Sequence, residues 1–341
     1  MMIRISVDDP RWSALVASHS EAGPFHHPAW AALLAATYGF DAFALVDFDE
    51  HGLVNRGLPV LEIGGRLQRR AWVALPYTDY LPVLTSSPAE NHTFLAAVDR
   101  AWRDADVGYL EVRSPVPGYE AYQFETDVIH RLELNDDPHV VFQRFHQMAA
   151  RGVRKAEREG LTVRRGERPE DLTEVFRSLH LITRRRQGAP IQPRRFFQLL
   201  WDEFLARQLG YVLLAYHGRE PVAGAVFLVW NGILTYKFGA SNPAALNLRP
   251  NHLIFWRAIR DACSQGMRMV DMGLSDHNNA GLRAFKSRWG ATEEPLLFTT
   301  LTEGPRGHRA GHAPRLLQAV IRHSPPIVCK AAGELLYRYA A

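Results

Sequence analysis

The sequence predicts a mixed α/β fold of the α+β type, in which mostly antiparallel sheets are flanked by helices in two domains. Its 341 residues, 47% of them hydrophobic, are enough for two domains with cores of their own and exclude global disorder. Short apolar, strand-like runs alternate with amphipathic helical segments along most of the chain. The turns at 49–52 and at 231–232 each join two apolar runs directly, which indicates antiparallel hairpins.

Residues 1–134 are the predicted N-terminal domain. Gly39 is placed to end its first helix, because glycine easily adopts the left-handed conformation of a helix end. The helices are expected at 28–39 and 91–104. The strands are expected at 42–48, 58–63, 71–75, 109–113 and 127–134. The loop LPYTDYLPVL follows the third of these strands and carries the acidic residue Asp79.

Residues 135–303 are the predicted C-terminal domain, which begins with one helix that Gly160 ends. Asp137 suits its N-cap and Pro138 its first helical position. Apolar side chains form one stripe of this helix, and arginines occupy another face. Further helices are expected at 169–186 and 193–209, and strands at 161–165, 211–216, 222–230 and 233–238.

The stretch 251–290 is the part of the sequence in which we expect the functional site. It is predicted to form a helix, a buried strand over 267–272, a loop and a second helix, followed by a last strand. Asp271 lies near the carboxyl end of the buried strand, where open α/β sheets place their ligands. Lys286 is the lone inward-facing polar candidate on the second helix.

The tail, 304–341, is basic and is expected to form a helix over 314–323 and a second segment beyond Pro325-Pro326. We expect this tail to pack on the N-terminal domain, with docking on a membrane surface as the alternative. No run of 18 apolar residues is present, so no transmembrane segment is expected. The N-terminus lacks the apolar region of a signal peptide. The default location is therefore cytoplasmic, and peripheral contact with the inner face of the membrane stays open.

Composition and motifs exclude several classes of function. The formal net charge of +4 is much smaller than that of a dedicated nucleic-acid binder. No set of side chains has a convincing metal-ligand spacing, so no metal is expected. The sequence contains no Gly-x-Ser-x-Gly, Walker or dinucleotide-binding motif. Hydrolases of the nucleophile-elbow type, nucleotidases and dehydrogenases are therefore disfavoured.

Five segments, in order, resemble the FemABX-like proteins of the GNAT acyltransferase superfamily. They are RGVRKAEREG, TRRRQGAPIQPRRFF, PVAGAVFLVWNGILTYKFGAS, LRPNHLIFWRAI and GLRAFKSRWG. HHPAW and LPYTDY are similar to the N-terminal half of the same group. The resemblance implies two tandem GNAT-like domains and an acyl-transfer activity. The group includes peptidoglycan bridge enzymes that use aminoacyl-tRNA, and shorter acetyltransferase-like members linked to polysaccharide or lipid chemistry.

The donor that the resemblance implies is either an acyl-CoA or an aminoacyl-tRNA. CoA-binding GNAT enzymes hold the pyrophosphate on the N–H groups of a glycine-spaced loop. The equivalent stretch here, 245–252, has no glycine, and Pro250 has no N–H to donate. Arg249, Asn251 and His252 are the residues expected to contact the donor. The bridge-forming relatives likewise lack the glycine loop, so both donors stay open.

Lys286, Asp271 and Asp79 are the predicted catalytic residues. In the bridge-forming relatives the lysine of the Phe-Lys pair is implicated in the acyl-transfer site, and an ammonium would stabilise the oxyanion of aminolysis. Asp271 or Asp79 would take a proton from the attacking amine. The structural alternatives are a solvated lysine for Lys286 and a strand-end cap for Asp271.

Side chains on several elements are predicted to bind the acceptor. Guanidinium groups suit phosphates, although arginines at the end of a helix also compensate its dipole. The candidate phosphate-binding residues are Arg151, Arg154, Arg184 and Arg186. The other predicted substrate contacts are Tyr236, Lys237 and Phe285.

We therefore predict a transferase that moves an acyl or aminoacyl group onto an amine of a cell-envelope or polysaccharide precursor. A peptidoglycan or exopolysaccharide intermediate, carried on a lipid or a nucleotide, would be such an acceptor. No nucleophile is evident, so the amine would attack the donor directly. One alternative is an acyl-CoA-dependent GNAT N-acetyltransferase. The other is a non-catalytic GNAT-fold protein that binds RNA or anionic lipid head groups.

Overall fold

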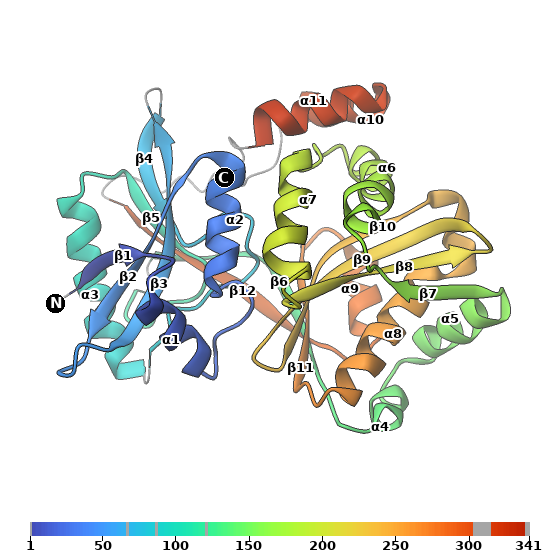
Figure 1. Ribbon diagram of the computed structural model, residues 1–341, viewed down its shortest axis with the longest axis horizontal. Helices are drawn as coiled ribbons and strands as arrows, with labels where there is room; N and C mark the ends of the chain where they lie inside the picture. Colours follow the sequence, from blue (N-terminus) through green and yellow to red (C-terminus); the bar gives the residue numbers. More distant parts are fainter. Residues whose placement is uncertain (1, 66–67, 86–87, 120–121, 303–314, 338–341) are drawn as a thin grey trace. The chain divides into compact units, whose positions relative to one another are not determined.

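The computed structural model describes residues 2–65, 68–85, 88–119, 122–302 and 315–337. The chain divides into two compact units. The first runs to Asp127 and resumes at Pro295, and the second contains Val128–Glu294 and the described tail. Two strands, β6 (Gln123–Glu133) and β12 (Thr292–Thr302), therefore contribute to both units (Figure 1). This division differs from the boundaries at 134 and 303 that the sequence suggested.

The first unit contains strands in the order β1-β2-β3-β4-β5-β12. Their bounds are β1 (Ile3–Ser6), β2 (Asp41–Phe48), β3 (Val54–Gly65), β4 (Gln68–Val73) and β5 (Tyr109–Val112). Only β4 and β5 pair in parallel. The helices are α1 (Pro10–Ser18), α2 (Pro28–Tyr38) and α3 (Pro88–Asp104). The sequence analysis missed β1 and α1, which are too short to show a clear hydrophobic period.

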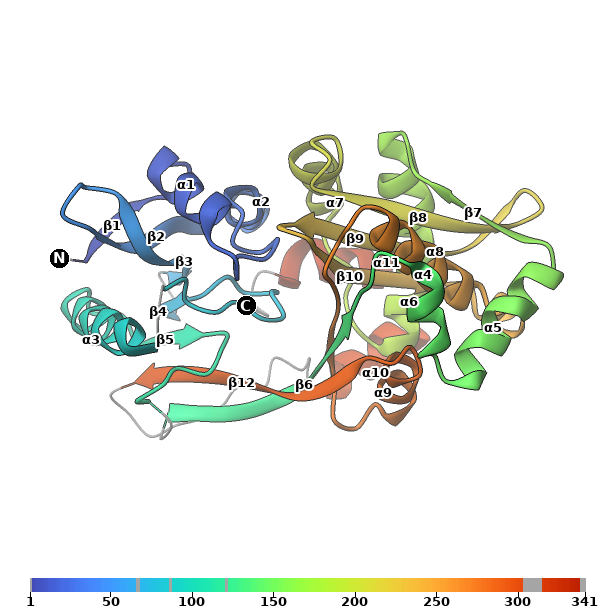
Figure 2. The same cartoon turned by 90° about the horizontal axis from the view of Figure 1, so that it is seen from below.

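The second unit contains strands in the order β6-β11-β10-β9-β8-β7, with β7 at the edge (Figure 2). Their bounds are β7 (Leu161–Arg165), β8 (Gly210–His217), β9 (Glu220–Trp230), β10 (Ile233–Ser241) and β11 (Met269–Ser275). All neighbours are antiparallel except β10 and β11. Mixed, mostly antiparallel strands flanked by helices confirm the predicted fold class.

Helices cover both faces of the sheet in the second unit (Figure 1). They are α4 (Pro138–Gln143), α5 (Gln147–Arg158), α6 (Arg177–Gln187), α7 (Arg194–Leu200), α8 (Pro250–Ser264) and α9 (Ala280–Ser287), with π-helical turns η2 (Asp171–Phe176) and η3 (Trp201–Leu205) and the 3₁₀ turn η4 (Pro243–Leu248). Phe227 of β9 belongs to the core that α5 and α8 form. Gly224, on the opposite face of β9, lies against Phe176 of η2. Thus α5 and α8 lie on one face, and η2 and α6 on the other.

The helix predicted after Pro138 is interrupted between α4 and α5. The His146 Nδ1 atom accepts the Met148 N–H and caps α5, while the His146 N–H donates to the Arg288 carbonyl at 2.8 Å. A single continuous helix was therefore the wrong prediction. The interruption ties the start of α5 to the chain directly after α9.

Aromatic side chains fix α9 against the sheet. Trp289, which follows α9, is fully buried, with its ring centroid 5.0 Å from that of Phe145 and 5.7 Å from that of Phe255. Buried aromatic pairs of this kind contribute large apolar areas and a preferred geometry. The helix that carries Lys286 is consequently held in one position.

The tail helices α10 (Arg315–His323) and α11 (Pro326–Leu336) pack on α6 of the second unit. Arg185 donates to the Ser324 carbonyl at 2.5 Å, and Gly333 lies directly on the Ile191 carbonyl. The expectation that the tail packs on the N-terminal domain is therefore not met by the described part of the tail, because its small residues fit the chain that follows α6. No helix in the described ranges is both long enough and apolar enough to span a bilayer.

Candidate functional site

The strands β10 and β11 separate at their carboxyl ends, and this opening is the candidate site. They pair in parallel only where Ile233–Thr235 face Met269–Asp271. Farther along, β10 pairs with β9 up to Ser241, and β11 pairs with β6 up to Ser275. Because the two strands turn to different partners, they do not pair with each other beyond Thr235 and Asp271. The carboxyl ends of neighbouring parallel strands are a common place for ligands.

Irregularities in both strands lie at this opening. The pairing of β10 shifts between Tyr236 and Phe238, so Lys237 is the bulged residue. The pairing of β11 shifts between Asp271 and Leu274. Bulges re-aim side chains and are frequent beside active sites. This bulge places the backbone of Lys237, a predicted substrate contact, at the opening, and the Lys237 ammonium lies 5.7 Å from the centre of the Phe238 ring.

The predicted catalytic residues Asp271 and Lys286 meet at Gly273. The Asp271 carboxylate accepts the Gly273 N–H at 2.7 Å. The Lys286 ammonium donates to the carbonyls of Gly273 at 2.8 Å and Leu274 at 2.7 Å. Lys286 is only 1% exposed and Asp271 8%, so Lys286 faces the interior as predicted. Gly273 has a φ of +69°, a left-handed conformation that glycine adopts without strain.

A row of rings leads from β10 to the start of α8. The ring centroids of Tyr236 and Phe255 are 4.8 Å apart, those of Phe255 and Phe285 5.2 Å, and those of Phe285 and His252 5.2 Å. A side chain at Gly152 of α5 would overlap the His252 ring. The structure thus brings three predicted contacts, Tyr236, Phe285 and His252, to one side of the opening.

Burial controls the protonation of two of these rings. It lowers the pKa of His252 to about 4, and the nearby cations Arg249 and Arg288 act in the same direction. His252 is therefore neutral at neutral pH. Burial also raises the pKa of the Tyr236 phenol, which keeps its proton.

The start of α8 offers few backbone donors to a phosphate. Arg249 has a φ of +65° and is exposed directly before Pro250, which has no N–H. The His252 N–H is already donated to the Arg249 carbonyl at 3.0 Å. Arg249 and Asn251 remain the candidate donor contacts here, and their chemistry is that of side chains rather than of a backbone cradle.

A buried polar group behind α9 was missed in the sequence. The His130 side chain is fully buried, and its Nε2 atom lies 3.1 Å from Glu293 and 3.4 Å from the Ser287 hydroxyl. Glu293 also accepts two hydrogen bonds from Arg283, at 3.0 and 2.6 Å. Burial and the Lys286 charge lower the pKa of His130 to about 4. More than 150 residues separate His130 from Ser287 and Glu293, so no local sequence pattern indicates that these side chains meet.

The four predicted phosphate-binding arginines do not form one group. Arg151 and Arg154 are on α5, and Arg184 and Arg186 are on α6, on opposite faces of the sheet. Arg184 donates its Nε–H to the Pro190 carbonyl at 2.9 Å, so it holds the chain that follows α6. A single phosphate site made of all four residues is wrong, because the sheet lies between the two pairs.

Asp79 lies in the first unit, in the loop after β4. Its neighbour Thr78 is fixed there, because the Thr78 hydroxyl accepts from the Trp30 indole at 2.8 Å and its carbonyl accepts from Arg113 at 2.7 Å. The Asp79 side chain is partly exposed. Asp79 thus belongs to a different unit from Asp271 and Lys286.

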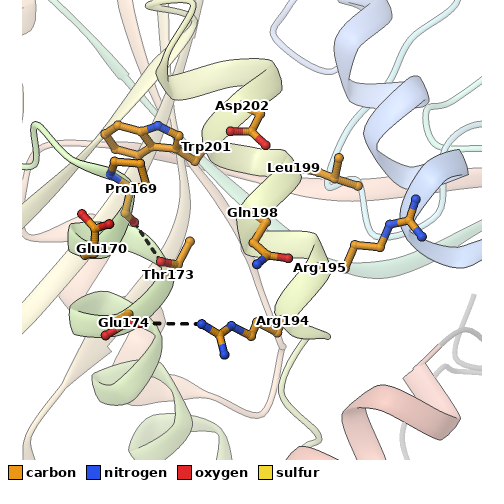
Figure 3. A pocket seen from close by; sticks show the side chains of 10 residues that line it. All are labelled: Pro169, Glu170, Thr173, Glu174, Arg194, Arg195, Gln198, Leu199, Trp201 and Asp202. Atoms are coloured by element: carbon orange, nitrogen blue, oxygen red, sulfur yellow. Dashed lines mark hydrogen bonds and ion pairs between the residues drawn. The ribbon is translucent and has the colours of Figure 1, made fainter.

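One cavity of about 580 Å³ lies between η2 and the α7–η3 helix (Figure 3). It contains none of the predicted residues. Arg194 crosses it toward Glu174, 3.6 Å away, and acidic and basic side chains share its walls. Such mixed walls do not select an anion. In the described parts of the chain, no three His, Cys, Asp or Glu residues are grouped to hold a metal ion.

Comparison with known families adds one result. Residues 143–287 match the family model of the acetyltransferase (GNAT) domain. This range contains the opening between β10 and β11 and ends just after Lys286. None of the curated proteins matches the chain in sequence.

Solved structures are similar over most of the chain. The crystal structure of FemX has a TM-score of 0.66 at 14% identity and covers 87% of this chain and 96% of its own. The C-terminal domain of a putative lysylphosphatidylglycerol synthetase from Agrobacterium fabrum has a TM-score of 0.57 at 14% identity, covering 85% and 90%. A tandem GNAT protein from the clavulanic acid biosynthesis pathway has a TM-score of 0.54 at 14% identity, covering 90% and 99%. At these identities the likeness concerns the fold, which both units share with these proteins.

Proposed function

We propose that this chain is an acyltransferase that moves an acyl or aminoacyl group onto an amine, because residues 143–287 match the acetyltransferase (GNAT) domain and the fold is similar to that of FemX. The acceptor would be a cell-envelope or polysaccharide precursor on a lipid or nucleotide carrier. The observation that carries the proposal is the opening between β10 and β11 with the Lys286 ammonium beside it. An ammonium kept out of water acts strongly on charge that develops nearby.

The proposed reaction is a direct transfer. The nitrogen lone pair of the acceptor adds to the acyl carbonyl carbon, which forms the new C–N bond and an oxyanion. Collapse of this intermediate breaks the bond to the ester oxygen of tRNA or to the sulfur of CoA. The amine nitrogen loses a proton and the leaving group gains one, so no nucleophile of the protein is needed.

Lys286 and Asp271 have separate roles in this proposal. Lys286 supplies the positive charge that favours the oxyanion, while its bonds to Gly273 and Leu274 fix its position. Asp271 accepts the proton of the amine. Asp79, in the first unit, is the second candidate for that proton.

An aminoacyl ester of tRNA is the donor that we favour. Pro250 cannot donate, and the His252 N–H is occupied, so the start of α8 lacks the usual cradle for the CoA pyrophosphate. The exposed arginines of α5, Arg151 and Arg154, would meet the phosphates of the polynucleotide instead. The match to the acetyltransferase model supports the alternative, an acyl-CoA-dependent N-acetyltransferase.

Calorimetric titration of the full-length chain tests the donor. Acetyl-CoA, charged tRNA and uncharged tRNA are titrated separately at two salt concentrations. The proposal expects charged tRNA to bind more tightly than uncharged tRNA, with no heat from acetyl-CoA. Micromolar binding of acetyl-CoA that needs its pantetheine arm would establish the alternative. Salt-sensitive binding that ignores the aminoacyl group would indicate a non-catalytic RNA-binding protein.

A further inference from the structure

The chain that joins α6 to α7, residues 188–193, is held by the tail helix α11. The Cys329 thiol donates to the Ala189 carbonyl at 3.5 Å, and the Glu334 carboxylate accepts the Arg194 N–H at 2.8 Å. Arg194 is the first residue of α7, so Glu334 satisfies a backbone donor that a helix leaves without an intrahelical partner. The tail therefore fixes this connection near its start and at its end.

The same connection carries a buried polar side chain that is paired with α6. Gln192 and His180 are each 4% exposed, and the Gln192 Oε1 atom lies 3.0 Å from the His180 Nε2 atom. An amide oxygen only accepts, so His180 carries its proton on Nε2 and donates it to Gln192. Burial lowers the pKa of His180 to about 3, which keeps the ring neutral. A buried polar pair holds one geometry, because separating the partners would leave both unsatisfied.

Aromatic rings join this pair to β10 at the candidate site. The His180 ring centroid lies 5.6 Å from that of Phe238, and the ring of Phe196 in α7 lies 5.8 Å from the same Phe238 ring. Phe238 directly follows the bulged residue Lys237. Beyond Thr235, β10 no longer pairs with β11, so the ring contacts from α6 and α7 support the strand where its neighbour has turned away.

A hydrogen bond at the end of β10 adds to these ring contacts. The Ser241 N–H donates to the Thr183 hydroxyl at 3.1 Å, and both residues are buried. Thr183 lies three residues after His180 on α6, so the two side chains share one face of the helix. That face of α6 therefore contacts β10 both beside the bulge and at the end of the strand.

We propose that α11 is a positioning element of the candidate site: through Gln192 and His180 it holds the bulge of β10 at the opening between β10 and β11. The inference deepens the proposed function and rests on it for the effect on acyl transfer. Lys237, at that bulge, is a predicted substrate contact, and a small displacement of such a contact slows a reaction strongly. Glu334, Gln192 and His180 are positioning residues, because each acts through another residue.

Hydrogen exchange of the full-length protein tests this coupling without a substrate. Gln192→Leu keeps the size of the side chain but removes the acceptor of the imidazole, and Glu334→Ala removes the acceptor of the first N–H of α7. In both variants we expect the backbone amides of 236–241 to exchange faster by roughly fivefold or more. Glu334→Gln keeps an acceptor oxygen and should exchange like the unchanged protein. So should Lys330→Met, at an exposed position of α11.

Two results of the exchange experiment would overturn the proposal. One is faster exchange confined to 188–193, because the tail would then hold only the connection. The other is equal acceleration in 236–241 and in β8, because the variants would then lower the stability of the whole unit.

A transfer assay adds the effect on the reaction. Gln192→Leu should lower kcat by about tenfold while donor binding stays unchanged, and Lys330→Met should alter neither. Unchanged kcat in Gln192→Leu would contradict a positioning role. An absence of transfer by the unchanged protein would instead overturn the proposed function, and the exchange result would still show whether α11 positions β10.

Discussion

Asp271 and Lys286 bind the same residue from two sides: the Asp271 carboxylate accepts the N–H of Gly273, and the Lys286 ammonium donates to its carbonyl. Fifteen positions separate the two side chains in sequence, yet both act on one left-handed glycine in β11. Each residue therefore has a structural role in addition to any catalytic role. Experiments on this site have to separate the structural role from the catalytic one.

The substitution Asp271→Asn separates the structural role of the Asp271 carboxylate from its catalytic role. The amide oxygen can still accept the Gly273 N–H, but asparagine cannot take a proton from an amine. We expect nearly unchanged thermal stability and a loss of acyl transfer of about 10²-fold or more. Asp271→Ala should lose both properties, since it leaves a buried N–H unpaired at a cost of about 1–3 kcal/mol. If Asp271→Asn is fully active, Asp271 is a structural cap and Asp79 becomes the candidate base.

Lys286→Met removes the charge but keeps a long side chain. We expect the rate of transfer to fall by about 10²–10³-fold, the usual effect of losing an oxyanion contact. Stability should fall by only about 1–3 kcal/mol, because two carbonyls lose their donor while a buried charge is also removed. Lys330→Met, at an exposed position of α11, is the matched control and should leave the rate unchanged. Equal rates for Lys286→Met and the unchanged protein would exclude a role in catalysis.

The sequence predicted the elements of this site better than their contacts. The strand with Asp271 and the helix with Lys286 show clear periods, so their existence and the inward direction of Lys286 were predictable. The hydrogen bonds of Asp271 and Lys286 to Gly273 were not predictable. They depend on the irregularity of β11, which arises from its pairing with strands that are distant in sequence, β6 and β10. His130 and Glu293 were missed for the same reason.

Two other differences have local causes. The two helices that carry the predicted phosphate-binding arginines, α5 and α6, were each predicted from the sequence. Only the order of the strands and the contacts of the helices show that they lie on opposite faces of the sheet. The tail helices were predicted from the proline break, whereas their docking on α6 depends on Gly333 meeting the Ile191 carbonyl. Hydrophobic periodicity shows which face of a helix is buried, but it does not show which element packs against that face.

Gly152→Ala tests the close approach of α5 to α8. Its new methyl group would overlap the His252 ring, so the ring or the helix has to move. We expect a loss of about 1–3 kcal/mol in the free energy of unfolding, as for other overpacked cores, and weaker donor binding. Gly281→Ala, at an exposed position in the first turn of α9, meets only Asn279 Oδ1 at an ordinary 3.8 Å and should instead gain roughly 0.4–1 kcal/mol. Urea unfolding measures both, and equal effects of the two variants would contradict the packing argument.

Glu293→Gln tests whether the polar group behind α9 positions Lys286. Glu293 joins Arg283 of α9 to His130 of β6, and glutamine weakens both contacts. We expect a stability loss of about 1 kcal/mol and a several-fold fall in kcat with KM unchanged. Arg207→Gln, which breaks an exposed ion pair with Glu203, is the matched control and should change neither the stability nor kcat. A fall in stability without any change in kcat would limit the group to a structural role.

Buried histidines make the stability of the fold depend on pH. Burial lowers the pKa of His180 to about 3, and those of His130 and His252 to about 4, each from an ordinary value of 6.5. Below pH 6.5 the unfolded chain binds protons that the folded chain does not, so stability falls as the pH drops from about 6.5 toward these values. Each such histidine contributes a slope of up to about 1.4 kcal/mol per pH unit.

His180 is the cleanest of these residues for a measurement. It is enclosed by the rings of Phe176, Phe197 and Phe238, on the face of the sheet opposite α5 and α8. In urea unfolding between pH 6 and 5, His180→Gln should have a slope of stability against pH that is shallower by about 1 kcal/mol per pH unit. His217→Gln, at an exposed position, is the comparison. The same slope in both variants would mean that His180 takes up its proton in the folded protein, against the burial that its ring contacts show.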